Sequence, residues 1–186
     1  MDPFLECWAW SLGVEGDFSN DPADSGGATR WGITEAVARR WGYTGPMAEL
    51  PATLAQSIAK REYWDRLRLG DIYALSPRLA RELFDIGFNM GQSRAGEFLQ
   101  RALNALNRQA KDYPDVKADG DIGAATLGAL TAFLRLRGKD GETVLLRALN
   151  CLQGAFYITL AEARQKDERF VFGWLMQRII VEGERT

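Results

Sequence analysis

The stretch "EGDFSNDPADSGGATRWGIT", from Glu15 to Thr34, interrupts a chain whose apolar residues otherwise follow helical spacing. It holds four carboxylates, four glycines, one proline and one tryptophan. Glycine and proline mark turns and loops in a sequence. Glycines separated by short runs allow a small β-hairpin near residues 16–33. This acidic loop is therefore the one place where we expect a minor β element.

Helix signals lie on both sides of the loop. Upstream, one helical face carries four residues at i, i+4, i+8 and i+11: Phe4, Trp8, Leu12 and Glu15. Downstream, Thr34 is expected to cap a helix that stops at Gly42, and Ser76-Pro77 provides an N-cap followed by proline at the first helical position. Further helical patterns cover residues 52–68 and the regions near 123–137, 142–165 and 168–181. The sequence therefore predicts a mainly α fold.

Bulk composition is that of an ordinary globular protein. The chain has 186 residues, 46% apolar and 26% charged, with a formal net charge of −2. These values fit one domain, with two lobes as an alternative, and predict neither nucleic-acid binding nor binding to anionic membranes. No uninterrupted apolar run approaches 18 residues, so we expect no membrane insertion. We also expect a monomer. The N-terminal stretch does not read as a signal peptide, so we expect a cytoplasmic protein unless something else releases it.

The scarcity of histidine and cysteine restricts the chemistry. The chain has no histidine, which excludes the usual Ser–His and Cys–His hydrolases and the common zinc hydrolase sites. Proton transfer would fall to carboxylates, Lys, Tyr or Cys. Cys7 and Cys151 are too few for a disulfide framework, and we expect both to be reduced and buried. The acidic stretch from Asp115 to Asp121 lacks the spacing and closing Glu of a calcium loop, so we predict a plain turn there, with no metal and no cofactor.

Glu15 is the strongest candidate for a general acid. As the last member of the apolar stripe, its carboxyl is expected to point inward at the helix end, where burial and the helix dipole would raise its pKa. Asp21 and Asp24 follow on a polar loop, where a carboxylate should stay ionised. Two carboxylates with pKa values pushed apart are typical of glycosidases. A Glu near a helix end and an Asn-Asp-Pro turn are also common in proteins without catalytic carboxylates, so a purely structural role for these residues stays open.

The loop carries a longer pattern, Glu15-Gly16-x-Phe18-x-Asn20-Asp21-Pro22-x-Asp24-x-Gly26-Gly27-x-Thr29-x-Trp31-Gly32-Ile33-Thr34. In this pattern the chain resembles glycoside hydrolase family 108, the phage and bacterial N-acetylmuramidases of the lysozyme-like superfamily. The resemblance continues through Tyr63-Trp64, Phe84–Gln100, Asp119–Leu130 and Phe170–Ile179. It implies a lysozyme-like catalytic lobe over residues 1–92 and a helical lobe over 93–186 that resembles a peptidoglycan-binding domain, together forming one globule.

The resemblance also implies substrate and roles. The family's catalytic glutamate falls on Glu15, and the expected reaction is hydrolysis of the β-1,4 bond between N-acetylmuramic acid and N-acetylglucosamine in peptidoglycan. Phage lysozymes with a Glu–Asp–Thr triad place the Asp nine residues after the Glu, which selects Asp24 over its rival Asp21. They place the Thr six residues later, where this chain has Arg30, so the hydroxyl would come from Thr29 or Thr34. The family further implies a phage endolysin that a holin releases to the periplasm or cell wall.

Several residues keep two interpretations. Trp31 is expected either to stack on a sugar ring or to pack in the core. Asn89 and Gln92 flank a helix break at Gly91 and would either bind N-acetyl or hydroxyl groups or cap a helix. The predicted site combines catalytic residues Glu15 and Asp24 with substrate-binding residues Asp21, Thr29, Arg30, Trp31, Thr34, Asn89 and Gln92.

Two other functions stay open. A lytic transglycosylase would use a single Glu and leave 1,6-anhydro ends. A non-catalytic wall-binding protein would not need Glu15. If the protein is a hydrolase, a loop carboxylate beyond a helix end can leave room for a water beside Glu15, which favours inversion at the anomeric carbon.

Overall fold

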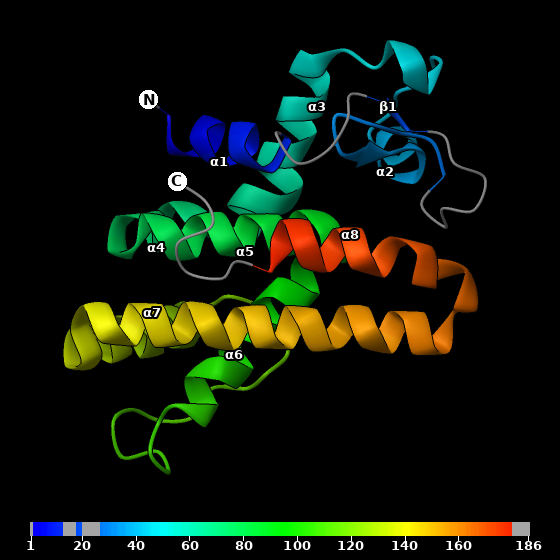
Figure 1. Cartoon of the computed structure of the whole chain (residues 1–186). Coiled ribbons are helices and arrows are strands. Elements are labelled where there is room, and N and C mark those ends of the chain that lie inside the picture. Colours follow the sequence, from blue (N-terminus) through cyan, green and yellow to red (C-terminus); the bar gives the residue numbers. More distant parts are fainter. Residues whose placement is uncertain (1, 13–17, 20–26, 180–186) are drawn as a thin grey trace.

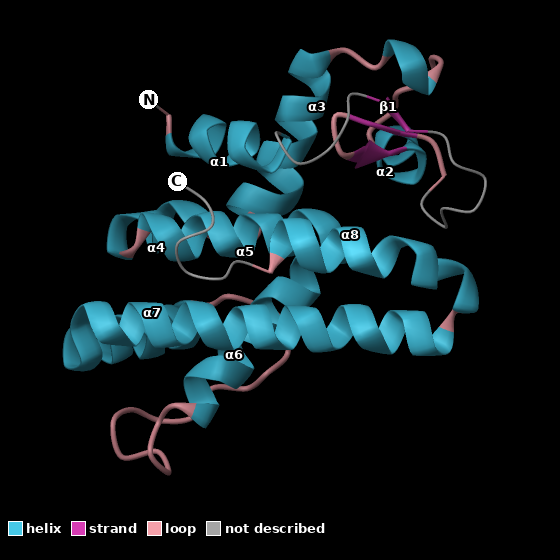
Figure 2. Cartoon of the chain, in the orientation of Figure 1, coloured by secondary structure: helices cyan, strands magenta, loops and turns pink. Residues whose placement is uncertain are grey.

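Helices form nearly all of the fold, with one small sheet at one end (Figures 1 and 2). The computed structural model describes residues 2–12, 18–19 and 27–179. Helix α1 (Pro3–Leu12) precedes an antiparallel sheet of β1 (Phe18–Ser19), β2 (Thr29–Arg30) and β3 (Ile33–Thr34), in the order β1-β2-β3. The predicted mainly helical, lysozyme-like fold with a minor β element is confirmed.

Two of the helices that follow the sheet begin at a side-chain cap. The helices here are α2 (Glu35–Arg40), η1 (Met47–Glu49), α3 (Ala52–Ala59), a π-helix η2 (Lys60–Asp65), α4 (Leu69–Leu75) and α5 (Pro77–Met90). The Thr34 hydroxyl accepts from the Val37 N–H at the start of α2, and the Ser76 hydroxyl accepts from the Leu79 N–H at the start of α5. Both predicted N-caps are therefore present. The short helix α4 was not predicted.

The C-terminal half consists of long helices. It contains α6 (Gln92–Ala105), α7 (Ala124–Ala163), η3 (Gln165–Asp167) and α8 (Glu168–Arg178). Gly138, with φ 57° and ψ −145°, divides α7 into two segments, in agreement with the two helices predicted there. By length and composition α7 could cross a membrane, a property that core helices of other proteins share. Here α7 packs against α5, α6 and α8, and α8 runs back along it (Figure 1).

An aromatic cluster fixes α1 on the centre of the fold. Phe4 and Trp8 are 3% and 4% exposed, and they contact rings from η2 and α5. The Trp8 and Phe88 ring centroids are 5.5 Å apart, and those of Tyr63 and Phe88 are 5.1 Å apart. Edge-to-face pairs of this kind add to the burial of the rings themselves. Phe4 and Trp8 of the predicted apolar face are thus buried, and Leu12 packs partly buried against the same core.

The acidic stretch before α7 is held by hydrogen bonds to α6. The Gln100 amide donates to the Asp119 carboxylate at 3.1 Å and to the Asp121 carbonyl at 2.9 Å. The backbone carbonyl of Gly120 lies so close to Gly96 that a Cβ there would meet it at 2.1 Å. Gly96 is therefore required for the close approach of this turn to α6.

The two cysteines differ in burial, which corrects one prediction. Both are free thiols, and Cys7 is buried, but Cys151 is exposed. Cys151 lies on a face of α7 that also carries the exposed residues Val144 and Ile158 at intervals of seven. This part of α7 carries apolar residues on several faces. The apolar neighbours of Cys151 in the sequence therefore did not show which face of the helix is buried.

We expect the two thiols to react very differently with an alkylating reagent. Burial raises the pKa of the Cys7 thiol to about 12, so almost no reactive thiolate forms there at pH 8. Intact-mass analysis after brief treatment with iodoacetamide should show one label on the native protein and two in urea. The Cys151→Ser variant should take up no label when native. A label on Cys7 in the native parent protein would contradict the structure.

Candidate active site

A cleft opens between the small sheet, the end of α5 and the last two long helices. Its volume is about 440 Å³. The N-terminal half contributes Thr29, Gly32, Thr34, Phe88, Asn89 and Met90. The C-terminal half contributes Phe156, Tyr157, Leu160, Arg164, Asp167, Phe170, Trp174 and Arg178. Residues separated by more than 140 positions in the chain therefore face one another across it.

Two threonine hydroxyl groups mark the sheet side of the cleft. Thr29 and Thr34 stand opposite each other in the β2–β3 ladder, and both line the cleft. Neighbouring side chains alternate between the two faces of a strand, so the adjacent pair, Arg30 and Ile33, projects to the other face. Ile33 is completely buried there. The described sheet thus presents the Thr29 and Thr34 hydroxyl groups to the cleft, and Arg30 does not line it.

The turn between these strands sets which residues face the cleft. Trp31 and Gly32 form a two-residue hairpin loop with φ values of 53° and 71°, the pattern of a type I′ turn. A positive φ is unfavourable for a tryptophan. The Trp31 indole is held by a hydrogen bond to the Leu50 carbonyl at 3.0 Å, and the Arg30 guanidinium lies 5.4 Å from its ring centroid. Trp31 packs against the core and does not line the cleft.

Arg178 and Asn89 line the cleft, and both form a hydrogen bond to Asp85, which lies behind them. The Arg178 guanidinium lies 2.8 Å from the Asp85 carboxylate, with side chains only 5% and 3% exposed. The Asn89 amide, one turn after Asp85 on α5, donates to the Asp85 backbone carbonyl at 2.8 Å. Helix α5 ends directly after this group at Gly91, whose φ of 90° suits only glycine. The Asp85–Arg178 ion pair thereby joins α5 to α8 beside the cleft.

The C-terminal side of the cleft is aromatic. The Trp174 ring stacks on Tyr157 with centroids 5.1 Å apart and on Phe170 with centroids 5.8 Å apart. Tyr157 is 4% exposed, whereas Phe170 and Trp174 are partly exposed to the cleft. The cleft therefore has polar hydroxyl and amide groups on one side and aromatic rings on the other.

Other predicted site residues lie elsewhere. The Gln92 amide donates to the Glu62 carboxylate at 3.2 Å, and the Trp41 indole donates to the same carboxylate at 2.8 Å. Gln92 thus joins the start of α6 to η2 and α2, outside the cleft. Glu15, Asp21 and Asp24 lie outside the described residues. In sequence, Glu15 stands three positions before β1, and Asp24 stands five before β2.

Sequence reasoning missed the aromatic side of the cleft. Phe170, Trp174 and Arg178 recur at intervals of four along α8, and Tyr157, Leu160 and Arg164 recur at three and four near the end of α7. Such stripes are the usual signature of a core-facing helix. Only the presence of a cation at the end of each stripe distinguishes them from core stripes.

The cleft lining combines aromatic rings and hydroxyl and amide groups with the charged side chains of Arg164, Asp167 and Arg178. Pockets that combine aromatic walls with a few fixed polar groups bind ligands having both apolar and hydrogen-bonding surfaces. Within residues 2–12, 18–19 and 27–179, no cluster of three or more Cys, Asp or Glu side chains could hold a metal ion.

The helical fold and this cleft define a lysozyme-like protein, and comparison with known proteins gives the family. Residues 8–91 match the glycosyl hydrolase 108 family, and residues 94–179 match a predicted peptidoglycan domain. The structure of SagA from Brucella abortus is similar, with a TM-score of 0.66, 23% sequence identity and coverage of 96% of this chain and 97% of that chain. No curated protein matches significantly. The chain thus contains a glycosyl hydrolase family 108 domain and is a glycoside hydrolase that acts on peptidoglycan.

The Asp85→Asn variant should be strongly destabilised. It removes the carboxylate that pairs with the buried Arg178 guanidinium at 2.8 Å, and breaking a buried pair costs about 3–5 kcal/mol. Urea unfolding should show a lower midpoint with an unchanged slope. Asp71→Asn is the matched control because Asp71 pairs with Arg68 at 2.7 Å on the surface, where such pairs contribute little. Equal losses in the two variants would contradict the role given to the buried pair.

Proposed function

We propose that the cleft binds a glycan strand of peptidoglycan and that Glu15 acts as the general acid in cleaving it. The proposed bond is the β-1,4 linkage between N-acetylmuramic acid and N-acetylglucosamine. The observation that carries the proposal is the cleft itself, which is lined by both family segments and has Thr29 and Thr34 on the strands that follow the acidic loop. A glycan presents hydroxyl groups and apolar ring faces, which suit the two sides of this cleft.

Each proposed group has a defined task. Glu15 protonates the leaving glycosidic oxygen. The chain has no histidine that could take this role. Asp24 orients an attacking water or stabilises the oxocarbenium-like transition state. Thr29 and Thr34 offer hydroxyl groups that can hold this water from the sheet. An inverting enzyme keeps its carboxyl groups about 6.5–9.5 Å apart, and we propose this arrangement for Glu15 and Asp24.

We also propose a biological setting for the protein. The resemblance of Glu15–Thr34 to phage muramidases supports a phage or prophage endolysin that works as a monomer and reaches the wall after holin-type release from the host cytoplasm. The net charge of −2 argues against electrostatic capture by the anionic wall as the main binding force. Contacts within the cleft would then supply the affinity.

Glu15→Gln should abolish lysis while leaving the fold intact. Loss of a general acid typically slows a reaction by ~10²–10⁴. Turbidity loss of purified sacculi measures the rate, and mass spectrometry of the fragments identifies reducing muramic ends. Glu97→Gln, on the surface of α6, is the matched control. Near-parent activity of Glu15→Gln would refute the assignment, and 1,6-anhydro ends from the parent protein would identify a transglycosylase instead.

Asp24→Asn should reduce the lytic rate far more than Asp21→Asn. The reason is the nine-residue spacing from Glu15, which matches the second carboxylate of phage lysozymes with a Glu–Asp–Thr triad. The same sacculus assay gives both rates, and urea midpoints show whether either variant loses stability. The reverse ranking would assign the second carboxylate to Asp21.

A further inference from the structure

We propose that Trp174, together with Phe170, forms a sugar-ring subsite within the catalytic cleft. The ligand class is an N-acetylated hexosamine ring of the glycan strand, and the inference rests on the proposed function of the cleft. It gives the C-terminal segment a defined task. This segment contacts the same strand that the N-terminal lobe cleaves and completes the groove from the opposite side.

The placement of the rings supports a binding surface. Phe170 and Trp174 both line the cleft and are partly exposed, and Trp174 stacks on the buried ring of Tyr157 with centroids 5.1 Å apart. The interplanar angles at Trp174 are 29° with Tyr157 and 21° with Phe170. Trp174 is therefore stacked against a ring of α7 and a ring of its own helix, which restricts its motion before any ligand arrives. A rigid aromatic surface gives up little conformational entropy on binding.

The opposite side of the cleft complements this aromatic surface. Thr29, Thr34 and Asn89 offer hydroxyl and amide groups from the sheet and α5. A pyranose ring has apolar C–H faces and a polar edge of hydroxyl and acetamido groups. A ring held with one face toward Trp174 would direct its polar edge to these groups. The cleft volume of about 440 Å³ lies in the range of small-ligand sites.

Contacts other than the Trp174 stack also attach α8 to the rest of the fold. Leu175 and Ile179 seat α8 on α7, because a Cβ on Gly154 would meet a side-chain carbon of each at 3.7 Å. The Asp85–Arg178 pair ties the end of α8 to α5. With these contacts present, partly exposed aromatic rings at the cleft are not required to attach the helix.

Substitution of Trp174 separates this role from catalysis. In a Glu15→Gln background, Trp174→Ala should weaken binding of a tetrasaccharide of alternating N-acetylglucosamine and N-acetylmuramic acid by roughly 10- to 30-fold, as removal of a central aromatic anchor does. With Glu15 present, it should raise KM and leave kcat nearly unchanged, because the contact is made equally in ground and transition states. Trp174→Phe should restore most of the affinity.

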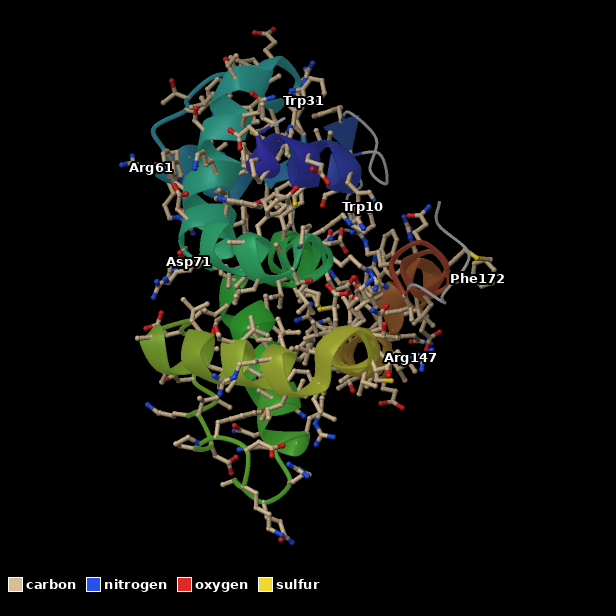
Figure 3. All side chains as sticks on the ribbon, turned by 90° about the vertical axis from the view of Figure 1, so that its left-hand side faces the viewer. Trp10, Trp31, Arg61, Asp71, Arg147 and Phe172 are labelled. Carbon is tan, nitrogen blue, oxygen red and sulfur yellow. The ribbon has the colours of Figure 1, made fainter. Side chains whose placement is uncertain are left out.

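Phe172→Ala is the matched control on the same helix. Phe172 is 76% exposed and points away from the body of the protein (Figure 3). Its removal should change neither tetrasaccharide affinity, measured by calorimetry, nor KM. If Trp174→Ala binds and turns over like Phe172→Ala, the subsite is refuted. Loss of lysis in Glu15→Gln alone would still support the proposed reaction.

Oxidation of the unmodified ring tests the subsite without relying on the fold of an alanine variant. N-bromosuccinimide treatment of Glu15→Gln, followed by peptide mass spectrometry, should show that the tetrasaccharide protects Trp174. Trp41, which donates to Glu62 outside the cleft, should not be protected. Equal oxidation of Trp174 with and without the tetrasaccharide overturns the inference. Protection in a protein whose parent form releases no fragments would support the subsite and refute the cleavage.

Discussion

The buried ion pair between Asp85 and Arg178 is the interaction on which the cleft depends. Its two side chains are 3% and 5% exposed, and their contact at 2.8 Å helps to offset the loss of water from both charges. Asp85 lies on α5 within the glycosyl hydrolase segment, and Arg178 lies at the end of α8 within the predicted peptidoglycan segment. Arg178 itself lines the cleft. The contact that joins the segments therefore borders the proposed binding surface, and moving α8 from α5 would break a buried ion pair.

Polar side chains reinforce the same junction at two other points. Glu62 accepts hydrogen bonds from Trp41 and Gln92, which ties the start of α6 to the N-terminal helices. The Asn150 amide of α7 donates to the buried Glu82 carboxylate of α5 at 3.3 Å. Hydrogen bonds have direction as well as strength, so these contacts fix orientation where apolar packing alone would tolerate sliding. This orientation brings the aromatic rings of α7 and α8 opposite the threonines of the sheet.

The sequence predicted the elements well because their signals are local. A side chain that caps its own helix, such as Thr34 or Ser76, acts within three residues, and an apolar stripe identifies a buried face by itself. The aromatic side of the cleft could not be predicted in this way. Phe170 and Trp174 have the spacing of core residues, and only the meeting of α8 with a sheet about 140 residues earlier shows that they border a cleft. The prediction that Cys151 is buried was wrong for a related reason. Helix α7 is apolar on more than one face, so its sequence pattern does not show which face is buried.

Position 30, where the Glu–Asp–Thr spacing would place a threonine, holds an arginine in this chain. The geometry of the hairpin explains why an arginine fits there. Side chains alternate along a strand, and moving a residue by one position transfers it to the other face of the sheet. In the register observed here, residues 29 and 34 face the cleft, whereas position 30 shares its face with the buried Ile33. A threonine at position 30 would therefore not reach the cleft. Arg30 instead lies against Trp31, whose unfavourable backbone angle is maintained by contacts on both sides of the turn. Arg30 therefore contacts the turn that sets the register in which Thr29 and Thr34 face the cleft.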